Sequence, residues 1–244
     1  MHLDQRYLKR VAVAVTAEPE EVTLNGEEQR GGPSITIDDA VGTYLSVVHR
    51  DAYTDDRDRV VTQPLEVRSN DSVTALAAAA TDVDIVINNA GILLPGALLT
   101  GGFADIEATF DINAFGPLRV ARAFAPILAA NGGGALVNMH SVLSWLGGSA
   151  AYGASKAAAW SITNSLRAEL HSQGTQVMGV HAGLIDTEMA AELPGPKTPA
   201  AEIARRIIDG LEGGALEVLA DDVTVAVKGA LSGPVENLNF SMAI

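Results

Sequence analysis

A tyrosine and a lysine four residues apart are the pair in this chain with the clearest chemical potential. Tyr152 and Lys156 lie in a stretch typical of a helix, so the spacing places both side chains on one helix face, one turn apart. An ammonium within a few ångströms of a phenol favours the phenolate and lowers the phenol pKa from its ordinary value of about 10. The pattern therefore predicts that Tyr152 acts as an acid or base nearer neutral pH.

A serine stands at the end of an apolar run shortly before this pair. Residues 135–139 are typical of a buried strand, and Ser141 follows them, so its hydroxyl is placed at the carboxyl end of that strand. From there Ser141 could donate a hydrogen bond to an oxygen that Tyr152 also touches. Tyrosine and lysine at this spacing occur by chance in many helices, and the strand and the serine distinguish this pair from a surface pair.

Size and composition are those of an ordinary globular protein. The chain has 244 residues, 48% of them hydrophobic, which suits a single α/β domain over residues 1–244. Its net charge of −14 argues against a nucleic-acid partner. The absence of cysteine excludes disulfides and thiol catalysis, and the histidines lack the spacing of metal ligands. No stretch approaches transmembrane length and residues 1–10 lack a signal-peptide core, so we expect a cytoplasmic protein without a membrane partner.

Apolar runs and amphipathic stretches alternate along most of the chain. Strands are predicted at residues 11–16, 46–49, 60–67, 84–87, 135–139, 177–180 and 216–219, and helices at 36–45, 70–80, 106–130, 152–171 and 200–211. Pro117 and Pro126 are expected to bend the third of these helices. Strands that alternate with helices indicate a doubly wound, Rossmann-like parallel sheet with helices on both faces.

Five motifs occur in one order along the chain. They are residues 88–91 (Asn-Asn-Ala-Gly), Asn113, Ser141, Tyr152 and Lys156. In this order and spacing the chain, from about residue 60 to 231, resembles the short-chain dehydrogenase/reductase family. The resemblance implies that Ser141 polarises a carbonyl or hydroxyl oxygen, that Tyr152 is the acid or base, and that Lys156 lowers the Tyr152 pKa. Asn113 would lie at a helix kink and hold a water that connects Lys156 to solvent.

The resemblance also implies where ligands bind. If a nicotinamide cofactor is bound, its contacts would be Asn89, Ala90, Gly91, Arg50, Lys156, Gly183 and Thr187. Arg50 follows the second predicted strand and would suit the 2′-phosphate of NADP(H). Residues 184–200 resemble the substrate lid, and their apolar side chains indicate a hydrophobic small-molecule substrate. The candidate substrate pocket comprises His140, Leu143, Trp145, Leu184 and Met189, although a histidine at a strand end and a tryptophan also fit a packing role.

Two features depart from the family pattern. Tyr152 follows Ser141 by 11 residues (152 − 141), and the family more often has about two more in this loop. Residues 16–23 read Thr-Ala-Glu-Pro-Glu-Glu-Val-Thr where the family has a glycine-rich turn for the cofactor pyrophosphate. Ala17, Glu21 and Thr23 fill the three glycine positions, and carboxylates would face the phosphates. Residues 17–45 are therefore predicted to be a divergent segment that makes the first β–α unit atypical.

Three functions fit these residues. The first, which the missing glycines favour, is proton chemistry on a carbonyl or hydroxyl group without a nicotinamide, as in an isomerase, dehydratase or cyclase. The second is an alcohol dehydrogenase or ketone reductase that binds NADP(H) or NAD(H) through a rebuilt loop, and the third is a non-catalytic scaffold. We expect the first function, with no tightly bound nicotinamide cofactor and no metal.

A homodimer or homotetramer is expected from the surplus of large apolar side chains on two helices. The helices at 106–130 and 152–171 carry Phe110, Phe124, Trp160 and Ile162, more than their inner faces need. The resemblance points the same way, because family members pair through these two helices.

Overall fold

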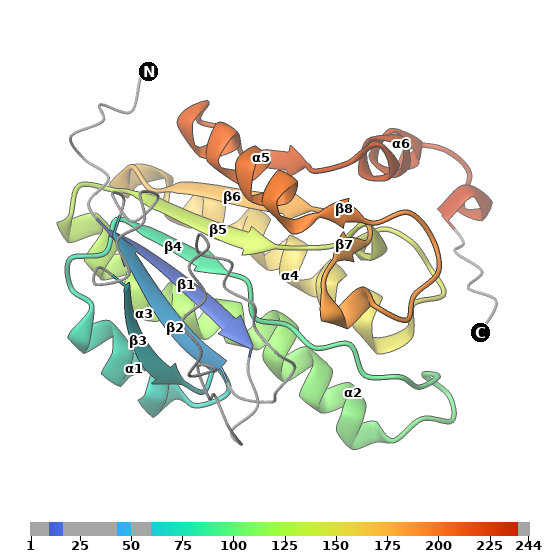
Figure 1. Ribbon diagram of the computed structural model, residues 1–244, viewed down its shortest axis with the longest axis horizontal. Helices are drawn as coiled ribbons and strands as arrows, with labels where there is room; N and C mark the ends of the chain where they lie inside the picture. Colours follow the sequence, from blue (N-terminus) through green and yellow to red (C-terminus); the bar gives the residue numbers. More distant parts are fainter. Residues whose placement is uncertain (1–9, 17–42, 50–59, 239–244) are drawn as a thin grey trace, which may run out of the picture.

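The computed structural model describes residues 10–16, 43–49 and 60–238, and within them a single seven-stranded sheet is the centre of the fold (Figure 1). The strands stand in the order β3-β2-β1-β4-β5-β6-β9. Their bounds are Arg10–Thr16 (β1), Thr43–His49 (β2), Val60–Leu65 (β3), Ile85–Asn88 (β4), Ala135–Met139 (β5), Gln176–His181 (β6) and Glu217–Leu219 (β9). From β1 through β4, β5 and β6 to β9, every pairing is parallel. The α/β fold with a parallel sheet is thus confirmed.

The strand β2 is the exception to the parallel arrangement, because it runs antiparallel to both β1 and β3. Thr43 pairs with Thr16, and His49 pairs with Arg10 at the start of β1. The chain therefore leaves β2 at the edge of the sheet opposite the carboxyl ends of β1 and β4. This reversed strand agrees with the prediction of an atypical first unit.

The prediction of a helix over residues 36–45 is wrong for its last three residues. Residues 43–45 belong to β2, whereas residues 36–42 lie outside the described residues. Tyr44 and Leu45 share a helical face with earlier apolar residues, and this suggested a helix. They also open the run Tyr-Leu-Ser-Val-Val, whose aromatic and β-branched residues suit a strand. Hydrogen bonds to neighbours on both sides then decide for the strand.

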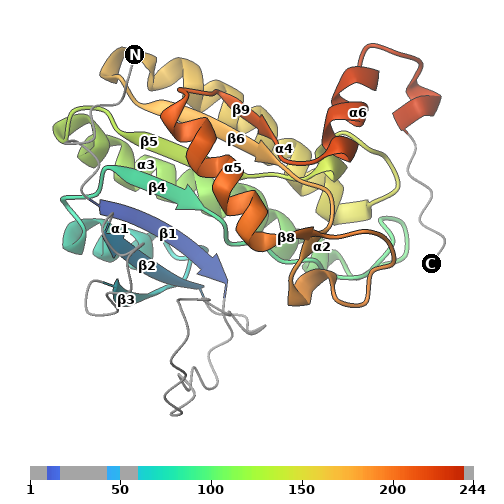
Figure 2. The same cartoon turned by 45° about the horizontal axis from the view of Figure 1, so that its top comes forward.

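Two apolar cores lie on the two faces of the sheet (Figures 1 and 2). On one face the sheet packs against α1 (Asn70–Ala79), α3 (Gly116–Ala130) and α4 (Ala150–Glu169), with Phe124, Leu128 and Leu136 fully buried. On the other face α5 (Ala200–Glu212) covers β5 and β6 through Ile203, Ile207 and Leu211. Helix α6 (Asp222–Ala230) and the short turn η7 (Val235–Leu238) follow β9 and were not predicted.

The long helix predicted at 106–130 is divided into three parts. A π-helical turn, η3 (Asp111–Phe115), separates α2 (Phe103–Phe110) from α3. Gly116 donates its backbone N–H to the carbonyl of Asp111, five residues back, which is the π-helical pattern. Pro117 follows at the start of α3 and has no N–H to donate to the fourth residue back, Asn113. The bend expected near Pro117 is therefore present as a π turn.

The segment after β6 contains a second, two-stranded sheet. It consists of β7 (Ile185–Asp186) and β8 (Thr198–Pro199), which pair in parallel, with the short turn η6 (Glu188–Ala190) between them. Thr198 also donates its N–H to the carbonyl of Leu184 at 2.8 Å. These contacts place the predicted substrate lid, residues 184–200, as a folded flap that starts where β6 ends.

Buried amides tie the middle of the sheet to α4. Asn88 donates to the side-chain oxygen of Asn138 at 2.8 Å, and Asn138 donates to the hydroxyl of Thr163 at 2.9 Å. All three side chains are almost fully buried. The network links β4, β5 and α4, so it fixes the strand ends relative to the helix that carries Tyr152. Asn88, the first residue of the motif at 88–91, thus helps to hold the sheet together.

Candidate active site

Ser141 is held at the carboxyl end of β5 by the neighbouring strand and by its own turn. On either side of it, His140 donates its N–H to the carbonyl of Val180, and Val142 donates to that of Ala182. Its hydroxyl oxygen accepts the N–H of Leu143 at 3.1 Å and caps the short turn η4 (Val142–Ser144). Because the oxygen is an acceptor there, the hydroxyl hydrogen can be donated to another oxygen.

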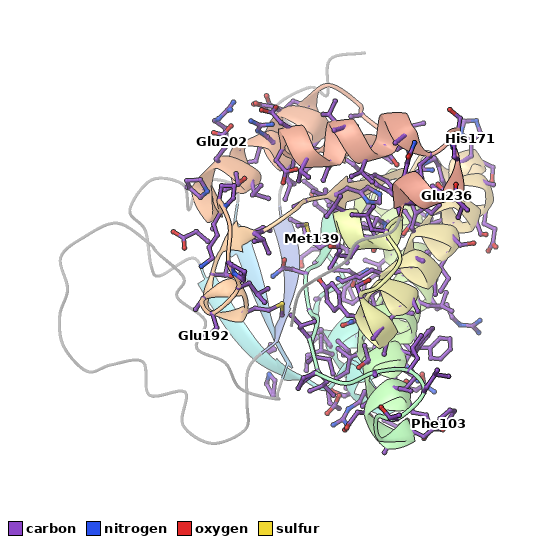
Figure 3. The ribbon with its side chains drawn as sticks, turned by 90° about the vertical axis from the view of Figure 1, so that its right-hand side faces the viewer. Phe103, Met139, His171, Glu192, Glu202 and Glu236 are labelled. Atoms are coloured by element: carbon purple, nitrogen blue, oxygen red, sulfur yellow. The ribbon has the colours of Figure 1, made fainter. Side chains whose placement is uncertain are left out.

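Tyr152 and Lys156 lie in the first two turns of α4, as the spacing predicted. The ammonium of Lys156 is buried, donates to the carbonyl of Met139 at 2.9 Å, and stands 5.8 Å from the centre of the Tyr152 ring. Figure 3 looks onto this side of the molecule, where Met139 marks the end of β5. Burial lowers the pKa of Lys156 to about 8. Burial also raises the pKa of Tyr152, and a hydrogen bond with Ser141 opposes that rise.

Asn113 lies in the π turn and fastens it to the loop after β4. Its side-chain oxygen accepts the N–H of Ile92 at 2.8 Å, and its amide donates to the carbonyl of Ile92 at 2.9 Å. The same amide donates to the hydroxyl of Ser155 at 3.0 Å, and Ser155 donates to the carbonyl of Tyr152 at 2.7 Å. Ser155 therefore joins Asn113 to the first turn of α4. Its position in the sequence had suggested no chemical role for it.

Gly91 lies close against two polar groups of the site. A side chain there would place its first carbon 3.3 Å from the oxygen of Asn113 and 3.4 Å from the ammonium of Lys156, so a glycine suits this close approach. The ammonium donates to the carbonyl of Met139 and carries three N–H groups in all. Such a group can also donate to the hydroxyl oxygens of a ligand such as a ribose. Of the neighbouring candidates, Ala90 is buried and Asn89 is exposed.

The other expected cofactor contacts differ in how the structure places them. Gly183 donates its N–H to the carboxylate of Asp221 at 2.6 Å, and a side chain there would collide with Val223. Packing against the start of α6 thus accounts for this glycine without a ligand. Thr187 is exposed in the flap. Arg50 lies outside the described residues, although β2 ends one residue earlier at the sheet edge opposite this site.

The expected substrate pocket is divided between surface and interior. Leu143, Leu184 and Met189 are partly exposed and remain available to a substrate. His140 and Trp145 are buried, and the Trp145 ring stacks on His181 at 3.9 Å. The placement of these two in the pocket is therefore wrong: they pack between β6, α4 and the turn after β5. The sequence does not indicate whether a histidine at the end of a strand points into the core or into a pocket.

The α/β fold, with Ser141, Tyr152 and Lys156 gathered at the end of β5 and the start of α4, agrees with the class of protein that the motifs indicated. A model of the family described as short chain dehydrogenase matches residues 45–197. The chain belongs to this family of oxidoreductases, as the order of the motifs predicted.

Individual relatives agree with the family. A solved short-chain dehydrogenase from Burkholderia cenocepacia, in complex with NADP, is 34% identical, covers 71% of this chain and 76% of its own, and has a TM-score of 0.68. The ketoacyl reductase HetN of a Nostoc species is 28% identical over 67% of this chain and 61% of its own length. The 1-deoxy-11-beta-hydroxypentalenate dehydrogenase of Streptomyces exfoliatus is 37% identical over 48% of this chain and 44% of its own. The match to each of these two curated relatives thus spans less than two thirds of its length.

The expectation that the chain uses no nicotinamide cofactor is wrong, since the solved relative at 34% identity holds NADP. That expectation rested on residues 17–23, which lie outside the described residues. It gave the loss of a glycine-rich turn more weight than the residues retained around Lys156.

No helix in the described part of the chain is long and apolar enough to cross a membrane. Within the same residues, no three His, Asp or Glu side chains gather as a metal site requires.

Proposed function

We propose that this chain is a nicotinamide-dependent oxidoreductase that interconverts a ketone and a secondary alcohol, with NADP(H) as the cofactor to test first. The observation that carries the proposal is the buried ammonium of Lys156, which lies 5.8 Å from the centre of the Tyr152 ring. Its N–H groups suit a ligand rich in hydroxyl groups, such as a nicotinamide ribose. The NADP complex of the solved relative supports the choice of cofactor.

Each residue has a defined part in the reduction. Ser141 donates its hydroxyl hydrogen to the carbonyl oxygen of the substrate and so polarises the bond. Tyr152, neutral in its buried position, gives its phenolic proton to the same oxygen. Lys156 would hold the ribose of a bound nicotinamide cofactor, and Asn113 holds the loop after β4 in place. When bound, that cofactor would supply the hydride for the carbonyl carbon.

The substrate is a small molecule with an apolar body. Leu143, Leu184 and Met189, the apolar residues expected at the pocket, are at least partly exposed, and the flap of residues 184–200 follows the end of β6, where Ala182 accepts the N–H of Val142. Burial of such groups favours an apolar ketone over a charged one. The carbonyl itself would be the polar group that fixes the orientation, between Ser141 and Tyr152.

Replacing Tyr152 with phenylalanine tests the proposal. The oxidation of NADPH in the presence of a panel of apolar ketones should fall by about 10²–10⁴-fold in kcat, because the proton donor is lost. Isothermal titration should find similar NADPH binding in both proteins, since the phenol faces the substrate. Wild-type protein that binds neither NADPH nor NADH, or a Tyr152→Phe variant with full reductase activity, would overturn the proposal.

A further inference from the structure

Buried nitrogens without a partner gather in one place behind Ser141. In the described part of the chain they are Nδ1 and Nε2 of His140, Nε1 of Trp145 and Nε2 of His181. The rings of His140, Trp145, Trp160 and His181, here called the His181 cluster, contact one another. Trp145 is stacked on His181 at 3.9 Å and 19°, and His140 lies 4.9 Å from His181. Polar groups kept in such a position call for an explanation beyond packing.

His181 makes one hydrogen bond that fixes its protonation. Its Nδ1 lies 3.2 Å from the carbonyl oxygen of Ser141. A carbonyl oxygen only accepts, so Nδ1 must carry the hydrogen. The other ring nitrogen, Nε2, is then a bare acceptor in the neutral ring, and a carboxylate oxygen of Glu217 lies 3.6 Å from it.

Nε2 of His181 and the carboxylate of Glu217 are both acceptors and would repel each other, and Lys228 offsets this repulsion. Its ammonium binds both oxygens of Glu217, at 2.9 and 2.8 Å, and so neutralises the charge that faces His181. Complete burial lowers the pKa of His181 to about 4, whereas the Ser141 carbonyl and Glu217 raise it and Lys228 and Lys156 lower it. The imidazole is thus neutral at neutral pH, with the hydrogen on the side of Ser141.

Both ends of the turn that carries the serine rest on this imidazole. Ser141, which opens η4, is bound through its carbonyl, and Trp145, which closes η4, is stacked on the ring face. Lys228 lies 4.8 Å from the centre of the Trp145 ring as a cation–π contact. The position of the turn therefore depends on His181 at two points.

We propose that His181 is a positioning residue, which as the Nδ1–H tautomer clamps residues 141–145 and so fixes the Ser141 hydroxyl against Tyr152. It touches neither substrate nor cofactor in this assignment. Only the kinetic part of its test rests on the proposed oxidoreductase function. The tautomer of His181 and the pKa of Tyr152 are properties of the protein without ligands.

Two variants separate the hydrogen bond from packing. His181→Leu keeps most of the bulk but removes the donor. His181→Asn keeps a donor, because the asparagine amide nitrogen stands near the place of Nδ1. His171→Leu is the matched control, since His171 is exposed beyond the end of α4, in the turn η5 (His171–Gln173), and is labelled in Figure 3.

The first measurements use nuclear magnetic resonance and need no activity. Long-range ¹H–¹⁵N spectra of the wild-type protein at neutral pH should show His181 as the Nδ1–H tautomer. The phenol of Tyr152, assigned with Tyr152→Phe, should titrate at a higher pH in His181→Leu, because the Ser141 hydrogen bond that lowers its pKa is lost. His181→Asn should recover most of the difference, and His171→Leu should titrate like the wild type.

The kinetic expectation is a loss in kcat without a loss of cofactor binding. His181→Leu should lower kcat by about tenfold to a hundredfold, as for a misplaced catalytic group, with the KM for NADPH unchanged. An Nε2–H tautomer or an imidazolium at neutral pH would overturn the proposal, and so would an unchanged Tyr152 titration in His181→Leu. If His181→Leu does not fold, the tautomer of His181 in the wild type and the Tyr152 titration in His181→Asn still test the proposal. An inactive wild type with the expected tautomer and titration would overturn the proposed function alone.

Discussion

At the scale of single residues, the site is set for proton donation. The sequence pattern predicted that Lys156 would lower the pKa of Tyr152, but the ammonium stands 5.8 Å from the ring centre and burial raises that pKa instead. A neutral phenol is the form that donates a proton to a carbonyl oxygen. Under the proposed function, this form of Tyr152 suits reduction of a ketone, whereas oxidation of an alcohol would be favoured at a higher pH, at which the phenolate forms.

The buried ammonium of Lys156 should cost stability. Its pKa in the folded protein, about 8, lies below the ordinary lysine value of 10.5, so the folded state holds the proton more weakly than the unfolded chain does. This opposes folding below about pH 8, and the penalty fades as the pH rises towards 10.5. We expect Lys156→Met to raise the free energy of unfolding at pH 7 by about 1–3 kcal/mol while reductase activity falls.

Urea unfolding of both proteins at pH 7 and pH 10 measures this effect. The gain in Lys156→Met should shrink at pH 10, where the wild-type lysine is neutral. Lys197→Met is the matched control, since Lys197 also donates to a backbone carbonyl, that of Ala191 at 2.8 Å, but lies near the surface. A Lys156→Met protein that is less stable than the wild type at pH 7 contradicts the argument.

The reacting residues could be predicted from the sequence and their supports could not. Ser141, Tyr152 and Lys156 lie within one strand–turn–helix unit, where spacing alone indicates a shared site. His181 lies forty residues after Ser141, whose carbonyl it contacts. It also faces Glu217 on β9, which in turn binds Lys228 on α6. Only the pairing of β6 with β9 brings these groups together. A sequence pattern carries no signal for such contacts.

At the scale of elements, the start of α4 shows what the short loop before it requires. Ala150, its first residue, has φ of 47°, and among the described residues it is the one non-glycine residue with a positive φ. Only 11 residues lead from Ser141 to Tyr152 (152 − 141), so the chain turns sharply after Gly148, whose φ is 95°. The sequence predicted an altered loop, and the positive φ of Ala150 at its end is a strained conformation for a residue with a side chain.

Ala150→Gly should therefore stabilise the protein. The left-handed conformation costs a residue with a side chain about 1–2 kcal/mol, and glycine avoids this cost but loses more entropy on folding. The net gain in the free energy of unfolding should be up to about 1 kcal/mol by urea denaturation. Ala154→Gly, at an exposed position one turn into α4, should instead lose about 1 kcal/mol. Equal losses in the two variants would show that position 150 is not strained.

The direction of β2 could not be predicted from the chain pattern. Alternating strands and helices favoured parallel pairing throughout the sheet. The successive pairings from β1 through β4, β5 and β6 to β9 are parallel, as expected. Residues 43–49 read equally well as a strand in either direction, because the period of two in a strand is the same both ways. The helix–strand pattern is clear only from residue 60 onward, where prediction and structure agree most closely.

At the scale of the whole molecule, apolar side chains on the surface indicate an assembly. Of the four residues expected at an interface, Phe124 is fully buried in the core of its own chain, and Trp160 lies in the His181 cluster. Phe110 and Ile162 are half-buried. The exposed apolar groups in this region are instead Leu98, Leu99, Phe103 and Phe115, on the loop before α2, on α2 itself and on the π turn. Phe103 stands at the outer end of α2 in Figure 3.

A homodimer or homotetramer through this surface is the last prediction. Phe103 is 70% and Phe115 is 47% exposed, and large apolar groups left so exposed are typical of an interface. Phe103→Glu combined with Phe115→Glu would bury two carboxylates in that interface, so the assembly should dissociate. Light scattering at micromolar concentration should find a multiple of the 25.3 kDa chain mass for the wild type and the single mass for the double variant. Leu216→Glu, at an exposed residue just before β9, should keep the wild-type mass, and a wild-type protein that is already a monomer would contradict the prediction.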